Sequence, residues 1–189
     1  MEIEIKIRLA SEQHVSALEQ ALNCPLLAKE DQENIFFEGK HQELIRQRLV
    51  FRIRLVHRSD GQSPLAIVAL KGNAVLVNGI ATCEEEEAPI DSQLALQVIE
   101  DPSTIPEVAK RHALLQKIVD RVQCPEGYVV MGRFRNVRHK YAWHGYKVEV
   151  DRTTVRAGEA STSLLDDRDI TYSFSQRNKF DNMRFASLI

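Results

Sequence analysis

The sequence offers little support for a disulfide framework, a structural zinc site or a membrane span. Its 189 residues include only three cysteines, which are widely spaced and form no CxxC pair, so neither disulfides nor zinc binding is indicated. No apolar run approaches the roughly 20 residues that a membrane-spanning helix needs. The charged N-terminal residues are also unlike a secretory signal. We therefore expect a cytoplasmic protein without a membrane partner.

The sequence also has no large excess of one charge, because it contains 25 Lys and Arg residues and 27 Asp and Glu residues. The resulting net charge of −2 provides no general attraction to nucleic acid or to an anionic membrane. No glycine-rich phosphate-binding loop of the GxxxxGKS/T or GxGxxG type occurs. Hydrophobic residues at 43% and charged residues at 28% are ordinary for a globular protein. We expect a single domain over residues 1–189, monomeric and with no nucleic-acid partner.

Apolar and charged residues alternate in several segments, which is the period of a β-strand with one apolar face. The first segment places Ile3, Ile5 and Ile7 on one side and charged residues on the other. Strands are predicted at residues 2–9, 26–37, 49–56, 65–71, 80–87, 128–141, 146–151 and 170–174, and helices at 11–21, 91–99 and 106–122. This order predicts an α+β domain dominated by antiparallel strands.

The polar sides of four strands carry charged residues two positions apart, so that each set projects from one face. These sets are Glu2/Glu4/Lys6, Arg52/Arg54, Glu84/Glu86 and Glu149/Asp151. One interpretation is the solvated outer face of an antiparallel sheet. The other is a barrel with its charges inward, where basic side chains bind phosphate oxygens and paired carboxylates bind a hard divalent cation. Alternation alone does not decide between the two.

Several short motifs along the chain carry a family resemblance. The first is Glu2-Ile-Glu-Ile-Lys6, an ExExK pattern at the start of the sequence. The others are Asn34–Glu38, Phe51–Arg54, Ile67–Lys71, Gly79 with Glu84 and Glu86, Asn136–Arg138, Lys147–Asp151, Phe174-Ser175 and Asn178–Phe180. Together they resemble the CYTH proteins, also called triphosphate tunnel metalloenzymes, and most of all the plant-type inorganic tripolyphosphatase branch.

The resemblance implies an α+β fold in which an antiparallel β-barrel encloses a tunnel with a charged lumen and helices packed outside. It implies divalent-metal-dependent hydrolysis of the phosphoanhydride bond of inorganic tripolyphosphate or a related triphosphate, with Mg²⁺ or Mn²⁺ as cofactor. The expected binding partner is inorganic tripolyphosphate or a nucleoside triphosphate. It assigns catalysis to Glu2, Glu4 and Lys6, and phosphate binding to Lys6, Arg52, Arg54, Lys71, Arg138 and Lys179. It assigns metal binding to Glu2, Glu4, Glu149 and Asp151, and a further place in the lumen to Glu84 and Glu86.

Two departures from the family pattern bear on barrel closure and on activity. Thr82 stands where the RxExE strand of the family has its arginine. Only residues 152–169 separate Asp151 from Ile170, where family members carry another ExE strand and a helix. We therefore expect a ring of seven strands or an incompletely closed barrel. The alternative function is a catalytically impaired module that still binds triphosphate or polyphosphate; cyclisation of ATP is less favoured, because the sequence shows no base-binding pocket.

Overall fold

The computed structural model describes residues 2–58, 60–77, 80–155 and 170–178, with the backbone alone for residues 2–6, 74, 76–77, 80–82, 155 and 170–178. The strands are β1 (Glu2–Leu9), β2 (Leu26–Gly39), β3 (Leu49–His57), β4 (Leu65–Val77), β5 (Ile80–Ile90), β6 (Tyr128–Trp143), β7 (Tyr146–Val155) and β8 (Ile170–Asn178). The helices are α1 (Glu12–Leu22), α2 (Glu43–Arg46), α3 (Ser92–Glu100), the 3₁₀ helix η1 (Pro102–Thr104), α4 (Ile105–Ala109) and α5 (Ala113–Arg121). Within these ranges, none of the helices has the length and apolar content that crossing a bilayer requires.

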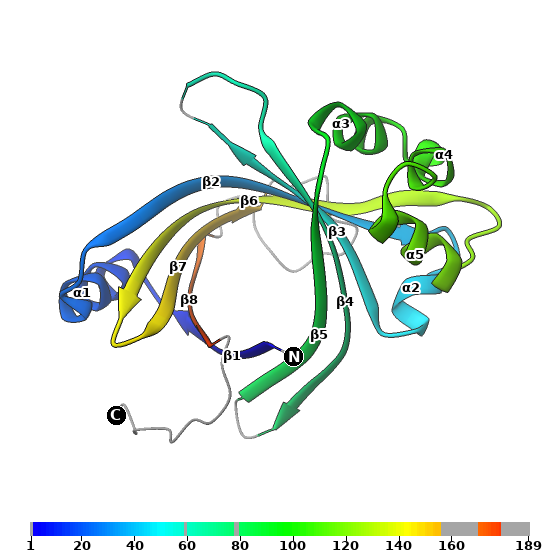
Figure 1. Cartoon of the computed structure of the whole chain (residues 1–189). Helices are drawn as coiled ribbons and strands as arrows, with labels where there is room; N and C mark the ends of the chain where they lie inside the picture. Colours follow the sequence, from blue (N-terminus) through cyan, green and yellow to red (C-terminus); the bar gives the residue numbers. More distant parts are fainter. Residues whose placement is uncertain (1, 59, 78–79, 156–169, 179–189) are drawn as a thin grey trace.

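The strands pair antiparallel in the order β1-β5-β4-β3-β2-β6-β7-β8 and close into a barrel. Figure 1 looks along the barrel, with α1 outside the ring on one side and α2 to α5 outside it on the other. The predicted α+β barrel with external helices is therefore confirmed. In the described strands, β8 pairs with β7 on one side and with β1 on the other, and β1 pairs with β5. Because β8 occupies the place next to β7, these pairings give neither a seven-strand ring nor an open edge.

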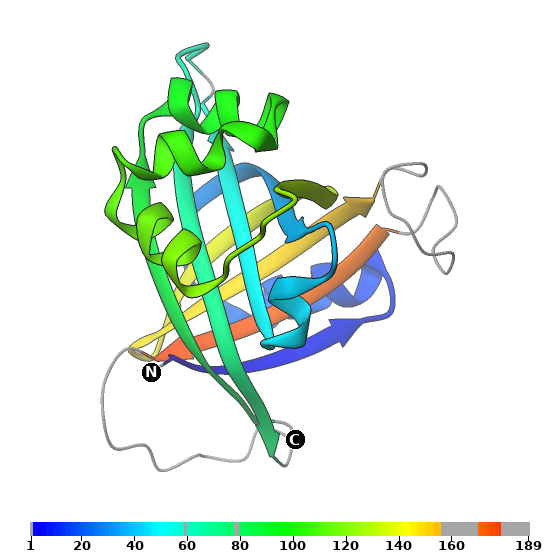
Figure 2. The same cartoon turned by 90° about the vertical axis from the view of Figure 1, so that its right-hand side faces the viewer.

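Much of the described barrel wall is apolar on its outer face and polar on its inner face. In β3, Phe51, Ile53 and Leu55 pack outward in one hydrophobic cluster with apolar residues of α2, α3, α4 and α5; the last three of these helices cover that part of the wall in Figure 2. Arg52 and Arg54 lie between them and project into the barrel. A second outer cluster joins α1 to β6 and β7 through Val15, Leu22, Tyr141, Val148 and Val150. The fold thus places its hydrophobic core outside the ring and leaves the lumen for charged groups.

The sequence predicts one helix over residues 106–122, and here the structure differs. The chain forms α4 and then α5, with His112 between them in an extended conformation. The His112 ring accepts a hydrogen bond from the Leu115 backbone N–H at the start of α5, and its other nitrogen lies 2.9 Å from the Pro89 carbonyl of β5. The break lets the apolar faces of both short helices join the same cluster, through Val108 in α4 and Ile118 in α5.

Helix α1 is also fixed to the barrel wall by a polar network around Glu19. This carboxylate accepts hydrogen bonds from Arg152 Nη2 (3.0 Å) and the Tyr141 hydroxyl (2.8 Å), and lies 2.7 Å from His139 Nδ1. Arg152 also pairs with Glu12 at 2.9 Å. Burial acts to raise the pKa of Glu19, but the hydrogen bonds from Arg152, His139 and Tyr141 outweigh it and lower the pKa to about 2. The network therefore holds Glu19 ionised.

Candidate active site in the barrel lumen

A cluster of basic side chains lies on the inner faces of β3 and β4. Arg52 and Arg54 are only 9% and 7% exposed, and Lys71 of β4 joins them. Lys71 faces inward because its neighbours Val68 and Leu70 alternate with it: these two pack in the outer hydrophobic cluster. The three sequence-predicted phosphate ligands of this region are thus brought together on one side of the lumen.

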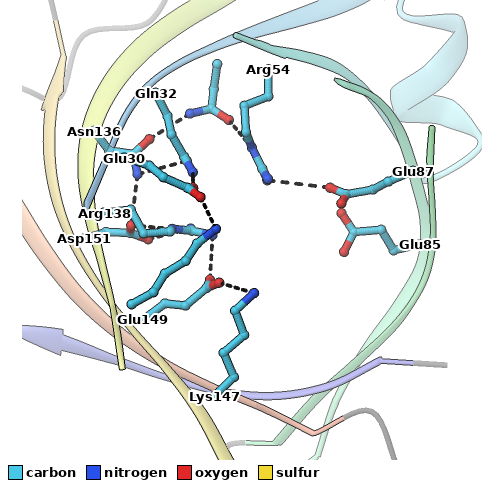
Figure 3. A network of polar contacts seen from close by, with 12 residues as sticks. Glu30, Gln32, Arg54, Glu85, Glu87, Asn136, Arg138, Lys147, Glu149 and Asp151 are labelled. Atoms are coloured by element: carbon cyan, nitrogen blue, oxygen red, sulfur yellow. Dashed lines mark hydrogen bonds and ion pairs between the residues drawn. The ribbon is translucent and has the colours of Figure 1, made fainter. Parts of the chain in front are cut away.

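Two carboxylates of β5 contact this basic cluster. Glu85 lies 2.9 Å from Lys71 Nζ and 3.4 Å from Arg52 Nη2. Glu87 lies 2.9 Å from Arg52 Nη2 and 3.6 Å from Arg54 Nη2. Each carboxylate therefore bridges two cations, and Figure 3 shows Arg54 reaching towards Glu87 inside the ring of strands.

The sequence-based assignment of Glu84 and Glu86 to the lumen is wrong. Glu84 accepts a hydrogen bond from the exposed Asn73 side chain, and Glu86 pairs with Lys117 of α5 with its own side chain 52% exposed. A run of four glutamates carries no sign of which members face inward. The face is set by Ala88 and Ile90, which pack in the outer hydrophobic cluster, so the even-numbered positions of β5 face outward.

The same alternation changes the comparison with the RxExE pattern. If the two glutamates of the motif are the inward Glu85 and Glu87, the arginine position falls on Cys83 rather than on Thr82. Cys83 is partly buried, and its backbone lies in register with that of Glu2 in β1. The departure from the family pattern therefore remains, but it belongs to a different residue of the strand.

On the opposite wall, Glu149 and Asp151 of β7 hold Arg138 of β6. Arg138 donates to Asp151 through Nε and Nη2, both at 2.7 Å, and its Nη1 lies 2.5 Å from Glu149 Oε2. Glu149 also pairs with Lys147 at 3.1 Å. Glu149 is only 1% exposed. Arg138, assigned to phosphate by the sequence, here presents three of its nitrogen atoms to these two carboxylates.

A row of amide side chains connects the two walls, and none of its members is among the site residues predicted from the sequence. Asn34 donates to Asn136 at 2.8 Å and accepts from Arg54 Nε at 3.3 Å. Asn136 in turn donates to Asp151 at 2.9 Å and to Gln32 at 3.3 Å. Figure 3 shows this chain of contacts running from Arg54 to the Asp151 pair. Strand alternation could have predicted part of this row, because Gln32 and Asn34 are two positions apart in β2 and therefore lie on the same face.

The two walls differ in how fully their arginines are neutralised. Burial lowers the pKa of Arg52 to about 10, and the positive charge of Arg54 acts in the same direction. Arg52 Nε is buried and has no hydrogen-bond partner among the described residues. Burial acts in the same way on Arg138, but the hydrogen bonds and charge of Asp151, together with the charge of Glu149, raise the pKa of Arg138 above its ordinary value. The buried arginine of the β3 wall is therefore less fully paired than the buried arginine of the β6 wall.

The donor chemistry of the lumen fits a hard divalent cation in part. Glu149 and Asp151 supply the carboxylate oxygens that Mg²⁺ and Mn²⁺ prefer. In the described part of the chain, no group of three or more Asp, Glu, His or Cys residues is arranged to hold a metal ion. The side chains of Glu2, Glu4 and Lys6, and the whole of Lys179, lie outside the described residues.

Comparison with known proteins agrees with this architecture. A family model described as the CYTH domain matches residues 1–162. The adenylyl cyclase candidate HpAC1 from Hippeastrum, which has a dominant triphosphatase activity, is 27% identical with a TM-score of 0.79. The match covers 95% of this chain and 80% of HpAC1. No curated protein sequence matches the chain at a significant level.

More distant solved structures share the fold. A protein of Pyrococcus horikoshii is 15% identical with a TM-score of 0.61, over 96% of this chain and 80% of its own. An adenylate cyclase candidate of Bacillus halodurans is 16% identical with a TM-score of 0.60, over 95% of this chain and 81% of its own. At this identity the two likenesses establish the fold and nothing further.

Proposed function

The chain belongs to the CYTH family, and from that premise we propose that it is a divalent-metal-dependent triphosphatase. It would hydrolyse a phosphoanhydride bond of inorganic tripolyphosphate or of a nucleoside triphosphate. The triphosphatase activity of HpAC1, the similar protein described above, supports the reaction class. The observation that carries the proposal is the basic cluster on one wall of the lumen, in which Arg52 and Arg54 are buried and Lys71 is partly buried.

Three cations on adjacent strands suit a linear polyanion better than a single phosphate. Guanidinium groups donate several hydrogen bonds in a fixed planar geometry that matches phosphate oxygens, and the unpaired Arg52 Nε is one such donor. Burial strengthens each of these contacts, because the lumen screens charge less than water does. The cluster would hold consecutive phosphoryl groups in line along the barrel.

Catalysis would then be mainly positioning and electrostatic stabilisation. As the terminal phosphoryl group is transferred to water, charge grows on its non-bridging and leaving oxygens, and fixed cations stabilise that charge. These fixed cations would be Arg52, Arg54 and Lys71. Lys6 and Lys179 are proposed as further phosphate ligands. Glu149 and Asp151, with Glu2 and Glu4, are the proposed ligands of Mg²⁺ or Mn²⁺, which when bound would neutralise phosphate oxygens.

Arg138 has two proposed roles, which are to position the carboxylates of β7 and to bind a phosphate oxygen. Its contacts with Glu149 and Asp151 fix both carboxylates in place before any ligand binds. Transfer of Arg138 to a phosphate oxygen would require breaking these contacts, at the cost of uncovering two buried carboxylates unless a cation replaces it. We propose that Arg138 positions the carboxylates first and contacts phosphate only when they bind a metal ion.

The direct test is incubation of the purified protein with tripolyphosphate and Mg²⁺ or Mn²⁺, following phosphate release beside calorimetric binding. Turnover supports the triphosphatase, and binding without turnover supports the impaired binding module. If neither occurs, the triphosphate proposal is overturned. With ATP, release of orthophosphate indicates hydrolysis, whereas pyrophosphate together with a cyclic nucleotide would indicate a cyclase.

A further inference from the structure

Glu85 and Glu87 occupy the positions where the basic cluster would receive an anion. Glu85 lies between Lys71 and Arg52, and Glu87 lies between Arg52 and Arg54. The side chain of Glu85 is 8% exposed and that of Glu87 is 32% exposed. Each carboxylate thus contacts two cations at once, Glu85 through both oxygens and Glu87 through Oε1, as the non-bridging oxygens of a phosphate would.

These carboxylates leave the cluster incompletely satisfied. Within the described chain, Arg52 Nε is buried without a hydrogen-bond partner, and the Glu85 contact with Arg52 is long at 3.4 Å. Arg138 on the opposite wall makes shorter contacts with Asp151, at 2.7 Å. An incoming anion would therefore displace the carboxylates of β5 more readily than those of β7.

We propose that Glu85 and Glu87 are internal anions that hold the basic cluster in place and that a triphosphate must displace on binding. The inference rests on the proposed function, because it concerns how the same substrate reaches the same cations. In the free protein the two carboxylates keep Arg52, Arg54 and Lys71 from repelling one another in a buried site. When a triphosphate binds, the negative charge of Glu85 and Glu87 opposes it, so affinity without metal is held low. Glu85 and Glu87 are thus positioning residues that set the metal-free affinity.

The sequence supplies a matched control on the same strand. Glu84 and Glu86 alternate with the inner pair, carry the same charge, and face outward to Asn73 and Lys117. The inner variant is Glu85→Gln with Glu87→Gln, and the outer variant is Glu84→Gln with Glu86→Gln. Both variants change the net charge equally, so a general electrostatic effect would alter both, whereas the proposed competition alters only the inner one.

The experiment is calorimetric titration of tripolyphosphate into each protein in the presence of a chelator, at physiological ionic strength. Removing two charges that contact the ligand-binding cations should tighten binding by about tenfold or more, while the outer variant stays within about twofold of the parent. A thermal melt should show the inner variant less stable than the parent without ligand, and stabilised more strongly by tripolyphosphate.

The outcomes separate this inference from the proposed function. If the parent protein with Mg²⁺ or Mn²⁺ neither binds nor hydrolyses tripolyphosphate, the proposed function is overturned. If the parent does so, but the inner variant binds no more tightly than the parent without metal, the internal-anion role is overturned. Should the double variant fail to fold, Glu87→Gln alone is compared with Glu86→Gln, because Glu87 is the more exposed of the inner pair. The expected direction is the same.

Discussion

Replacing Asp151 by asparagine tests how much the buried ion pair of the lumen contributes to the stability of the barrel. Asp151 accepts two hydrogen bonds from Arg138, both at 2.7 Å, and one from Asn136 at 2.9 Å. The side chains of Arg138 and Asp151 are 10% and 8% exposed. Asparagine keeps the shape but removes the charge, and it turns one acceptor of the Arg138 fork into a donor.

The expected loss follows from these contacts. Breaking one side of a buried pair costs about 3–5 kcal/mol, because it leaves a buried charge uncompensated. Glu149 still lies against Arg138 Nη1, and the remaining amide oxygen can accept one bond, so we expect the free energy of unfolding to fall by about 2–4 kcal/mol. For a protein of this size that corresponds to a melting temperature lower by about 5–15 °C.

The assay is thermal unfolding followed by circular dichroism, without ligand, beside the control variant Asp31→Asn. Asp31 pairs with Arg135 at 2.9 Å, between side chains that are 45% and 48% exposed. An exposed pair contributes about 0–1 kcal/mol, so the control should lower the melting temperature by no more than about 3 °C. Equal shifts for the two variants would refute the reasoning, because burial would then make no difference to the pair.

Three further predictions address the other charged groups. Glu19→Gln should lower the free energy of unfolding by about 1–2 kcal/mol at neutral pH. Because the pKa of Glu19 is lowered to about 2, this difference should be fully present above the ordinary pKa of 4.5 and should fade as the pH falls towards 2. Chemical unfolding that gives the same difference at pH 3 and pH 7 would contradict the prediction. Arg54→Ala should weaken tripolyphosphate binding by about 10- to 100-fold in calorimetry. The control Arg135→Ala, on the outer face of β6, should leave the dissociation constant unchanged. Equal losses of affinity in the two variants would remove Arg54 from the phosphate ligands. Replacing Glu2 and Glu4 by glutamine should shift the metal dependence of turnover to higher concentration, and superimposable metal titrations of variant and parent would exclude both from the ligand set.

Strand alternation made much of this fold predictable from the sequence. In β3 the order Phe51-Arg52-Ile53-Arg54 specifies both faces, because apolar and charged residues cannot exchange sides without burying the charges under the helices. The inward face of β7 follows in the same way from Val148 and Val150. The four glutamates of β5 contain no such contrast, so their orientation depends on apolar residues further along the strand.

Other features depended on contacts that a single segment does not encode. The break at His112 uses the Pro89 carbonyl of another element, and the amide row needs Asn34 and Asn136, which lie 102 positions apart in the sequence. Closure of the ring depends on how β8 pairs with both β7 and β1. These features depend on contacts between residues far apart in the sequence, which the periodicity of a single segment cannot predict.

The barrel wall is a single layer of strands, with the hydrophobic core on one side and the charged lumen on the other. An added residue in the middle of β3 would reverse the faces of every residue beyond it: Ile53 would turn into the lumen and Arg54 would turn beneath the helices. The same insertion between β3 and β4 would leave both faces intact. Sequence length inside the strands is therefore constrained twice, once by the core and once by the site, whereas an insertion between β3 and β4 shifts neither face. Natural and engineered length changes should accordingly gather in connections outside the core helices, such as the one between β3 and β4.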